Sequence, residues 1–328
     1  ADVMKKLLPI LLLAALLLSA CGAQSASPAP APSAPEAVSA PAEESASSPE
    51  AGTAAILLTG DGAEIHSGGV KAEGNVITVA AVGEYRISGE LRDGQIVVDT
   101  GEDPVDVTLI LDGVSVTNPE GPALWVKQAK NVHLQLAPGS ENLLISGKEA
   151  DLASFDESRS GAAVYAEDDL IVEGAGNLHV LGYLNNGITC KDDLQIKGGS
   201  LEVLSANNGV RASESLEIKG GSLRVSAGND GLKTSSSAKE GKGYLRISGG
   251  EVVLVAAGDG VSAETEFLME GGSLTVTGSN KHGVVSKDDL VITGGTVTVT
   301  AQNVALSGKD CVKIAAASLT LAAGTDAI

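Results

Sequence analysis

Aromatic residues are scarce in this chain. They make up 2% of its 328 residues, whereas hydrophobic residues of all kinds make up 43%. A large core must therefore be filled by Val, Leu, Ile and Ala. With 41 glycines as well, this composition favours a β-solenoid, in which small aliphatic side chains stack in columns, over the core of a globular enzyme.

Cysteine and histidine are also rare, with three and four residues. Three cysteines in different settings do not make a disulfide framework, and the histidines form no evident catalytic or metal-binding constellation. Cys21 closes a targeting signal. Cys190 shares a column with small inward residues, which predicts a buried filler. Cys311 lies several repeats away, so a disulfide bond between these two is excluded.

Positive charge is in short supply. Lys and Arg number 22 against 42 Asp and Glu, which gives a formal net charge of −20. Like charges repel, so nucleic acid and an anionic membrane surface are excluded as partners. An acidic polymer remains compatible with this charge if a divalent cation neutralises the junction.

The N-terminal region predicts export. Met4-Lys5-Lys6 is followed by an apolar run that is too short for a stable membrane span. Leu18-Ser19-Ala20-Cys21 resembles the lipobox of bacterial lipoproteins. We therefore expect a lipoprotein signal peptide at 1–21 and lipidation of Cys21; the alternative is an ordinary signal peptide. Residues 22–54, almost all Ala, Ser, Pro and Glu, predict a disordered linker. The protein is then extracytoplasmic and touches the membrane only through its lipid.

From residue 166 onward the sequence aligns with itself. The anchoring apolar position of each repeat falls at Leu170, Leu194, Leu216, Leu245, Phe267, Leu290 and Val312. The steps are 22 to 24 residues, except for one of 29 that contains an insertion at 235–243. Apolar residues alternate within each repeat, and Gly-Gly and Asn-Gly separate the runs, so each repeat predicts three short strands. One register over seven repeats indicates stacked parallel coils.

The pattern continues less cleanly over 76–146, and we extend the predicted solenoid to 55–328. The acidic stretch 148–160 predicts a loop that projects from one coil. The chain stops at 326–328, midway through a coil and without a capping element, which predicts that it is truncated at the C-terminus.

Two polar columns flank a short strand in every coil. The position before this strand is occupied by Asn186, Asn208, Asp230, Asp259, His282, Val304 and Asp326. The pair that opens the next strand includes Asp168-Asp169, Asp192-Asp193, Glu214-Ser215, Asp288-Asp289 and Asp310-Cys311. Successive coils lie about 4.8 Å apart, so stacked carboxylates repel unless something sits between them. Two carboxylates one coil apart can share a calcium ion; alternatively, Asp and Asn stand here because they hydrogen-bond to the backbone of turns.

A third column consists of Trp125, Tyr165, Thr189, Arg211 and Lys233, each between two inward apolar positions. The outward aromatics on adjacent coils could stack on sugar rings. The two cations would repel each other unless an acid or an anionic ligand pairs with them. The alternative is that the aromatics pack under the 148–160 loop and that the bases pair with nearby acids.

Several motifs carry a family resemblance: GEYRISG at 83–89, DGVSV at 112–116, LNNGI at 184–188, KDDL at 191–194 and GNDGLK at 228–233. With them, residues 70–328 resemble the carbohydrate-binding, calcium-containing β-helix lipoproteins of clostridia and relatives. The resemblance implies a right-handed single-stranded parallel β-helix, calcium at the aspartate turns and binding of plant or cell-wall polysaccharide, acidic sugars included. It also implies likeness to polysaccharide lyases. The sequence departs from the family pattern at Glu214-Ser215, His282, Val304 and Cys311.

Three functions follow from these features. The first is a monomeric surface lipoprotein that binds acidic polysaccharide through calcium and outward side chains. The second is a calcium-dependent polysaccharide lyase in which the ion acidifies a proton of the uronate and Lys233 removes it. The third is a structural or adhesive stalk. The scattered bases disfavour the enzyme.

Overall fold

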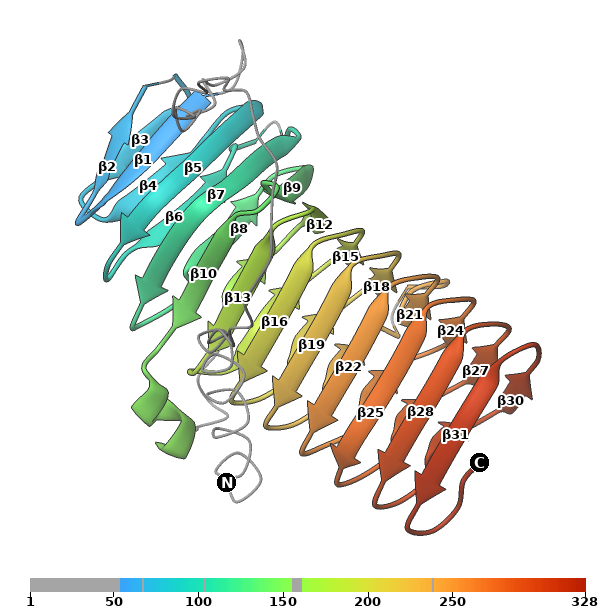
Figure 1. Ribbon diagram of the computed structural model, residues 1–328. Coiled ribbons are helices and arrows are strands. Elements are labelled where there is room, and N and C mark those ends of the chain that lie inside the picture. Colours follow the sequence, from blue (N-terminus) through green and yellow to red (C-terminus); the bar gives the residue numbers. More distant parts are fainter. Residues whose placement is uncertain (1–53, 67, 103, 155–160, 238) are drawn as a thin grey trace, which may run out of the picture. The chain divides into compact units, whose positions relative to one another are not determined.

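The computed structural model describes residues 54–66, 68–102, 104–154, 161–237 and 239–328, which form an all-β solenoid with long parallel sheets (Figure 1). The expected signal peptide, Cys21 and nearly all of the expected linker lie outside the described residues. Within those residues, no helix has the length and hydrophobicity that a membrane-spanning helix requires.

Each regular coil contributes one strand to each of three faces. The first face contains β3 (Val70–Glu73), β4 (Val76–Val79), β6 (Gln95–Asp99), β8 (Leu124–Gln128), β11 (Ala162–Ala166), β14 (Asn186–Cys190), β17 (Val210–Ala212), β20 (Leu232–Thr234), β23 (Val261–Ala263), β26 (Val284–Ser286) and β29 (Leu306–Gly308). The second face contains β9 (Asn131–Leu136), β12 (Asp169–Gly174), β15 (Asp193–Ile196), β18 (Ser215–Ile218), β21 (Tyr244–Ile247), β24 (Phe267–Met269), β27 (Asp289–Ile292) and β30 (Cys311–Ile314). The third face contains β10 (Glu141–Ser146), β13 (Asn177–Gly182), β16 (Ser200–Ser205), β19 (Ser222–Ala227), β22 (Glu251–Ala256), β25 (Ser273–Ser279), β28 (Thr296–Ala301) and β31 (Ser318–Ala323).

Four further strands and one short helix complete the described structure: β1 (Ala54–Gly60), β2 (Ala63–Ile65), β5 (Gly83–Leu91), β7 (Val107–Asn118) and the 3₁₀-helix η1 (Glu149–Ser154). The long strand β7 joins the second and third faces, because its first half pairs with β9 and its second half with β10. Gly113 has a φ of +77° in the middle of β7. There the buried side chain of Asn142 accepts the backbone N–H groups of Gly113 and Val114. A glycine and a buried amide therefore support the bend at this corner.

The register confirms the predicted parallel coils. On the second face, Leu170, Leu194, Leu216, Leu245, Phe267, Leu290 and Val312 are direct neighbours from strand to strand. Among the described strands, the antiparallel pairs are β1 with β2 and β3 with β4, so the solenoid begins with two hairpins rather than with regular coils.

Stacked aliphatic side chains fill the interior, as the composition predicts, and Phe267 is the largest fully buried side chain among the described residues. Cys190 is part of this core, and burial raises the pKa of its thiol to about 12. Cys311 is exposed and both cysteines are free, as expected.

The glycine motifs mark two kinds of bend. In the Gly-Gly turns the second residue is left-handed, as at Gly221 with a φ of +79°. In the Asn-Gly turns the reason is close packing: a Cβ on Gly209 would lie 2.1 Å from Val225 Cγ1 and 2.7 Å from the carbonyl oxygen of Gly231. The Asn-Gly turns place one polar column directly before the short strands of the first face, whereas the Gly-Gly turns join the second face to the third.

Candidate functional site

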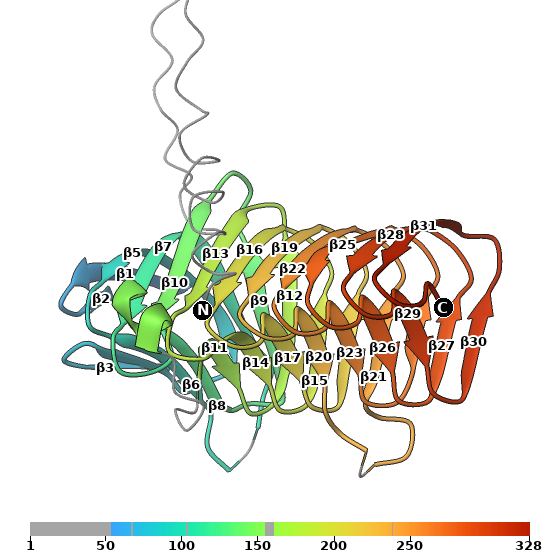
Figure 2. The ribbon, with the colours of Figure 1, turned by 90° about the horizontal axis from the view of Figure 1, so that it is seen from below.

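The predicted third column is present on the outer side of the first face. Trp125, Tyr165, Thr189, Arg211 and Lys233 are direct neighbours on β8, β11, β14, β17 and β20. Figure 2 shows these strands side by side along one face of the solenoid. Buried residues flank each of the five on its strand, and Trp125, Tyr165, Arg211 and Lys233 are partly exposed, as predicted. Thr189 is the exception, because its own side chain is buried. At about 4.8 Å per strand, the column forms a continuous line, hereafter the first-face column.

The aromatic end of the first-face column is partly exposed and has polar neighbours. Trp125 Nε1 donates to Glu167 Oε1 at 3.4 Å, and Lys191 Nζ lies 6.0 Å from the centre of the Tyr165 ring. Burial raises the pKa of the Tyr165 hydroxyl. The described part of the 148–160 loop folds into η1. There Glu149 lies near Tyr183, whose pKa is raised by burial and by the charge of Glu149, rather than near either of these two aromatics. The described residues thus leave ring surface available next to a carboxylate and an ammonium group.

The two cations of the first-face column differ in their partners. Lys233 Nζ lies 2.7 Å from Oδ2 of Asp230, whose side chain is only 4% exposed. Arg211 Nη2 donates to Ser235 Oγ at 3.2 Å, and its Nε is buried without an acceptor among the described residues. The alternative in which the bases of this column pair with nearby acids therefore holds for Lys233 but not for Arg211.

The polar column before the short strands forms a hydrogen-bond ladder. In each case a side-chain oxygen accepts the backbone N–H of the equivalent residue one coil further on: Asn186 from Asn208 at 3.0 Å, Asn208 from Asp230 at 3.3 Å, Asp230 from Asp259 at 2.9 Å and Asp259 from His282 at 2.9 Å. Buried backbone N–H groups require such acceptors. With its second oxygen on Lys233, Asp230 has both carboxylate oxygens engaged. These contacts are those expected if Asp and Asn stand in the turns because they hydrogen-bond to the backbone, which is the alternative to calcium binding.

The acidic pairs at the other end of the short strands meet the insertion at 235–243. Lys242 Nζ lies 2.7 Å from Asp193 Oδ2 and 3.2 Å from Glu214 Oε2. Lys239 forms a second ion pair with Glu214. The hydrogen bonds from Lys239 and Lys242 hold the pKa of Glu214 below its ordinary value. In Figure 2 the insertion projects beside β20 and β21.

Two carboxylates of the same cluster have no ion pair with a described lysine. Burial is the main cause that raises the pKa of Asp192, and the negative charges of Glu214 and Asp169 add to it. Burial also raises the pKa of Asp169, although its Oδ1 accepts the N–H of Asp193 at 3.1 Å. Asp168 Oδ2 accepts the N–H of Ala129 at 2.8 Å. Asp168, Asp169, Asp193 and Glu214 therefore already have protein donors, two of which are cationic, whereas the Asp192 carboxylate has none among the described residues.

The column of acidic pairs has fewer protein partners near the C-terminal end of the described chain. Asp288, Asp289 and Asp310 form no ion pair with any described residue, and Asp288 and Asp310 are exposed. Among the described residues, no group of three or more His, Cys, Asp or Glu side chains could alone hold a metal ion. A calcium ion at these acids would therefore need backbone carbonyl oxygens and waters among its ligands, as calcium sites commonly have. The residues fit calcium here better than at Asp193 and Glu214, where ammonium groups already neutralise the charge.

Sequence reasoning missed the role of the insertion. The 29-residue step marked it, and its two lysines stand out in a chain poor in positive charge. Nothing in the repeat pattern, however, states that they fold back onto Glu214 one coil away and Asp193 two coils away. Lys191 and Glu167, which contact the aromatics, follow directly after inward residues of the first face and were also missed.

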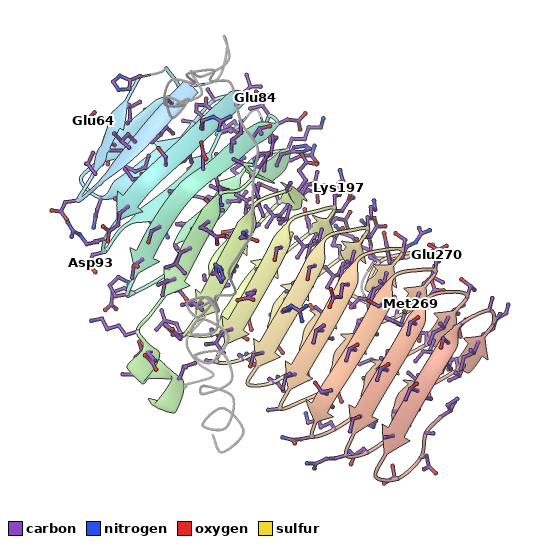
Figure 3. The ribbon with its side chains drawn as sticks, viewed as in Figure 1. Glu64, Glu84, Asp93, Lys197, Met269 and Glu270 are labelled. Atoms are coloured by element: carbon purple, nitrogen blue, oxygen red, sulfur yellow. The ribbon has the colours of Figure 1, made fainter. Side chains whose placement is uncertain are left out.

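The other two faces carry charge that is largely balanced. On the second face, Arg246 Nε donates to Glu270 Oε2 at 2.7 Å. Figure 3 shows Glu270 and Lys197 on the same margin of the solenoid, whereas Met269 beside Glu270 is fully buried. On the third face, Arg224 pairs with Glu251 at 2.9 Å. The first face differs because aromatic and cationic side chains follow one another in a single line.

The fold and the first-face column define a class of protein: parallel β-solenoids that carry a line of outward aromatic and polar side chains on one sheet. The chain belongs to the family described as carbohydrate-binding domain-containing protein, whose model matches residues 73–277 and 268–328. A protein of that description from Acetivibrio thermocellus is 35% identical over 127 residues, which are 39% of this chain and 44% of the relative. The match thus covers less than half of the relative's length.

A solved structure is similar over most of the solenoid. It is the polysaccharide lyase-like protein from C. thermocellum, in a gadolinium derivative, with a TM-score of 0.57 and 27% identity. The similarity covers 84% of this chain and all of the solved chain. The family model and the relative agree with a carbohydrate-binding role, and the solved structure agrees with the predicted likeness to a polysaccharide lyase-like protein.

Proposed function

We propose that the first-face column binds polysaccharide, and that the protein holds such a polymer without cleaving it. The observation that carries the proposal is the direct register of Trp125 with Tyr165, followed in line by Thr189, Arg211 and Lys233. Aromatic side chains offer apolar surface to sugar rings, with a polar edge for hydroxyl groups. The family membership supports carbohydrate as the ligand class.

We further propose an acidic polymer, of the pectin or cell-wall kind, as the ligand. A line that begins with aromatics and ends with cations suits sugar rings that bear carboxylates. For the architecture we propose a right-handed single-stranded parallel β-helix, working as a monomer. Calcium is proposed at Asp288, Asp289 and Asp310, which form no ion pair with any described lysine or arginine; there the ion would neutralise stacked carboxylates and support the coils.

The location proposed for this binding is the outer side of a bacterial membrane, with the lipid on Cys21 as the anchor. The hydrophobic stretch and the LSAC motif support it. Replacing Cys21 by Ala should move the protein from the membrane fraction to the soluble fraction. A variant that still sediments with membranes after its linker is cut would remove the anchor from the proposal.

The lyase alternative rests on the solved lyase-like neighbour and on Lys233 as a base. A general base must be within hydrogen-bond reach of the proton that it abstracts. Lys233 Nζ is held in an ion pair 2.7 Å from the buried Asp230 carboxylate and would have to leave this partner to reach a substrate. This contact is why the binding function is preferred.

One experiment separates these functions. The protein is titrated with polygalacturonate and with neutral glucans, and ultraviolet absorbance is followed for unsaturated products. Binding without new absorbance supports the binding function, and a rise in absorbance supports the lyase. If neither binding nor new absorbance is observed, the structural or adhesive stalk remains. Trp125→Ala should weaken binding about tenfold through lost stacking. Tyr244→Ala, which removes an aromatic from the second face, is the matched control and should bind as the parent does.

A further inference from the structure

Arg211 is an exception among the arginines of the described chain. The other four each lie within 4.0 Å of a carboxylate: Arg86 near Asp112, Arg92 near Asp61, Arg224 near Glu251 and Arg246 near Glu270. Among the described residues, Arg211 has no such partner and makes a single hydrogen bond, to the neutral hydroxyl of Ser235. In a protein with a net charge of −20, an arginine without a carboxylate requires an explanation.

The hydrogen-bond ladder of the polar column before the short strands supplies that explanation. The residue three positions before each outward side chain can reach it across the turn: Asn186 Nδ2 donates to Thr189 Oγ1 at 3.0 Å, and Asp230 accepts from Lys233 at 2.7 Å. The equivalent residue for Arg211 is Asn208, which carries no charge. Its amide is used by the ladder, since Asn208 Nδ2 donates to Asn186 Oδ1 at 3.0 Å. One coil thus balances its outward cation, while the coil before it leaves its cation unbalanced.

We propose that Arg211 is the residue that selects anionic sugars, by binding a uronate carboxylate directly and without a bridging calcium ion. The proposal rests on the proposed function of the first-face column and names the specificity determinant within it. A guanidinium offers a planar fork of donors that matches a carboxylate. Among the described residues, Ser235 accepts from Nη2 and Nε is buried, so the remaining Nη donors are the ones left for a ligand. Arg211 lies two strands from Tyr165, about 9.6 Å at the usual strand spacing. One polymer along the face therefore contacts both side chains.

Lys233 contributes little to this selection. Its charge is matched by Asp230, which is buried and held in the ladder by the N–H of Asp259. A uronate at Lys233 would have to compete with an intramolecular carboxylate at 2.7 Å. The two cations of one column are therefore expected to differ in function although they are direct neighbours in the sheet.

The test uses two polymers that share a backbone, polygalacturonate and its methyl ester, which lacks the charge. The parent protein should bind polygalacturonate more tightly than the ester, with or without a calcium chelator. Arg211→Gln should weaken binding to polygalacturonate about tenfold and leave binding to the ester nearly unchanged. Arg224→Gln, the same change at an ion pair on the third face, should match the parent. Asp230→Asn with Lys233→Gln, which removes both charges of the pair, should keep the preference for polygalacturonate.

Several outcomes would overturn the inference. Arg211→Gln could weaken both polymers equally, which would make Arg211 a general contact. The Asp230 and Lys233 double variant could abolish the preference as Arg211→Gln does, or the chelator could abolish it in the parent, which would indicate a calcium bridge. A parent that binds both polymers equally refutes the selection but not the binding. A parent that binds neither polymer, nor any other polysaccharide tried, refutes the proposed function itself.

Discussion

Two stretches of the solenoid carry the same sequence motif in different surroundings. KDDL occurs at 191–194 and again at 287–290. In the first stretch, lysines from the insertion at 235–243 neutralise Asp193 and its neighbour Glu214. In the second, Asp288 and Asp289 form no ion pair with any described residue. A repeated motif thus fixes position in the coil, whereas the electrostatic state of that position depends on what folds over it.

The largest expected effect concerns the ion pair of Lys233 with the buried Asp230, which lies directly before the insertion that covers the first stretch. Lys233→Met should lower the free energy of unfolding by about 2–3 kcal/mol, because it leaves the Asp230 carboxylate buried without a cation. Urea denaturation measures this loss. The double variant with Asp230→Asn should recover most of it, since the amide keeps the bond to the N–H of Asp259. A single variant as stable as the parent would contradict the pairing of these residues.

Calcium should act on the second stretch. If ions bind at Asp288, Asp289 and Asp310, calcium at a hundredfold excess over its dissociation constant should stabilise the fold by about 2.7 kcal/mol. Thermal unfolding with calcium and with chelator measures the effect. Asp288→Asn with Asp310→Asn should abolish the calcium dependence, whereas Glu214→Gln should retain it. Equal midpoints for the parent in calcium and in chelator would remove calcium from the proposal.

Much of this comparison could be drawn from the sequence, but not its cause. Periodicity predicted the register of Leu170, Leu194 and the later anchors because stacking of side chains repeats from coil to coil. It predicted the first-face column for the same reason. It could not predict that Lys242 reaches Asp193, because an insertion follows no repeat. Nor could it distinguish Asp230 in a ladder from Asp288 at the surface, since burial and partners depend on the folded coil.

Removing one lysine of the insertion should make the first stretch resemble the second. Lys242→Met should cost about 1–2 kcal/mol, because Asp193 and Glu214 lose a partly buried partner. The same variant should become more stable on addition of calcium at this cluster. Lys287→Met, at an exposed pair with Glu264, is the matched control and should change stability by less than about 0.5 kcal/mol. Identical behaviour of the two variants would show that the insertion has no special electrostatic role.

The smallest effect has the opposite sign. Burial and the neighbouring acids raise the pKa of Asp192 in the folded state, so the ionised form opposes folding. Its contribution favours folding at low pH and is lost as the pH rises through the raised folded pKa. Asp192→Asn should therefore stabilise the protein at pH ~7, by less than about 1 kcal/mol, and the gain should vanish near pH ~3, where the carboxyl is protonated in both states. Unfolding free energies at the two pH values, measured with chelator, test this prediction, with Asp310→Asn as the exposed control. Destabilisation at neutral pH would mean that the Asp192 carboxylate has a favourable partner. The lysines of the insertion would then not be the only groups that neutralise the carboxylates of the first stretch.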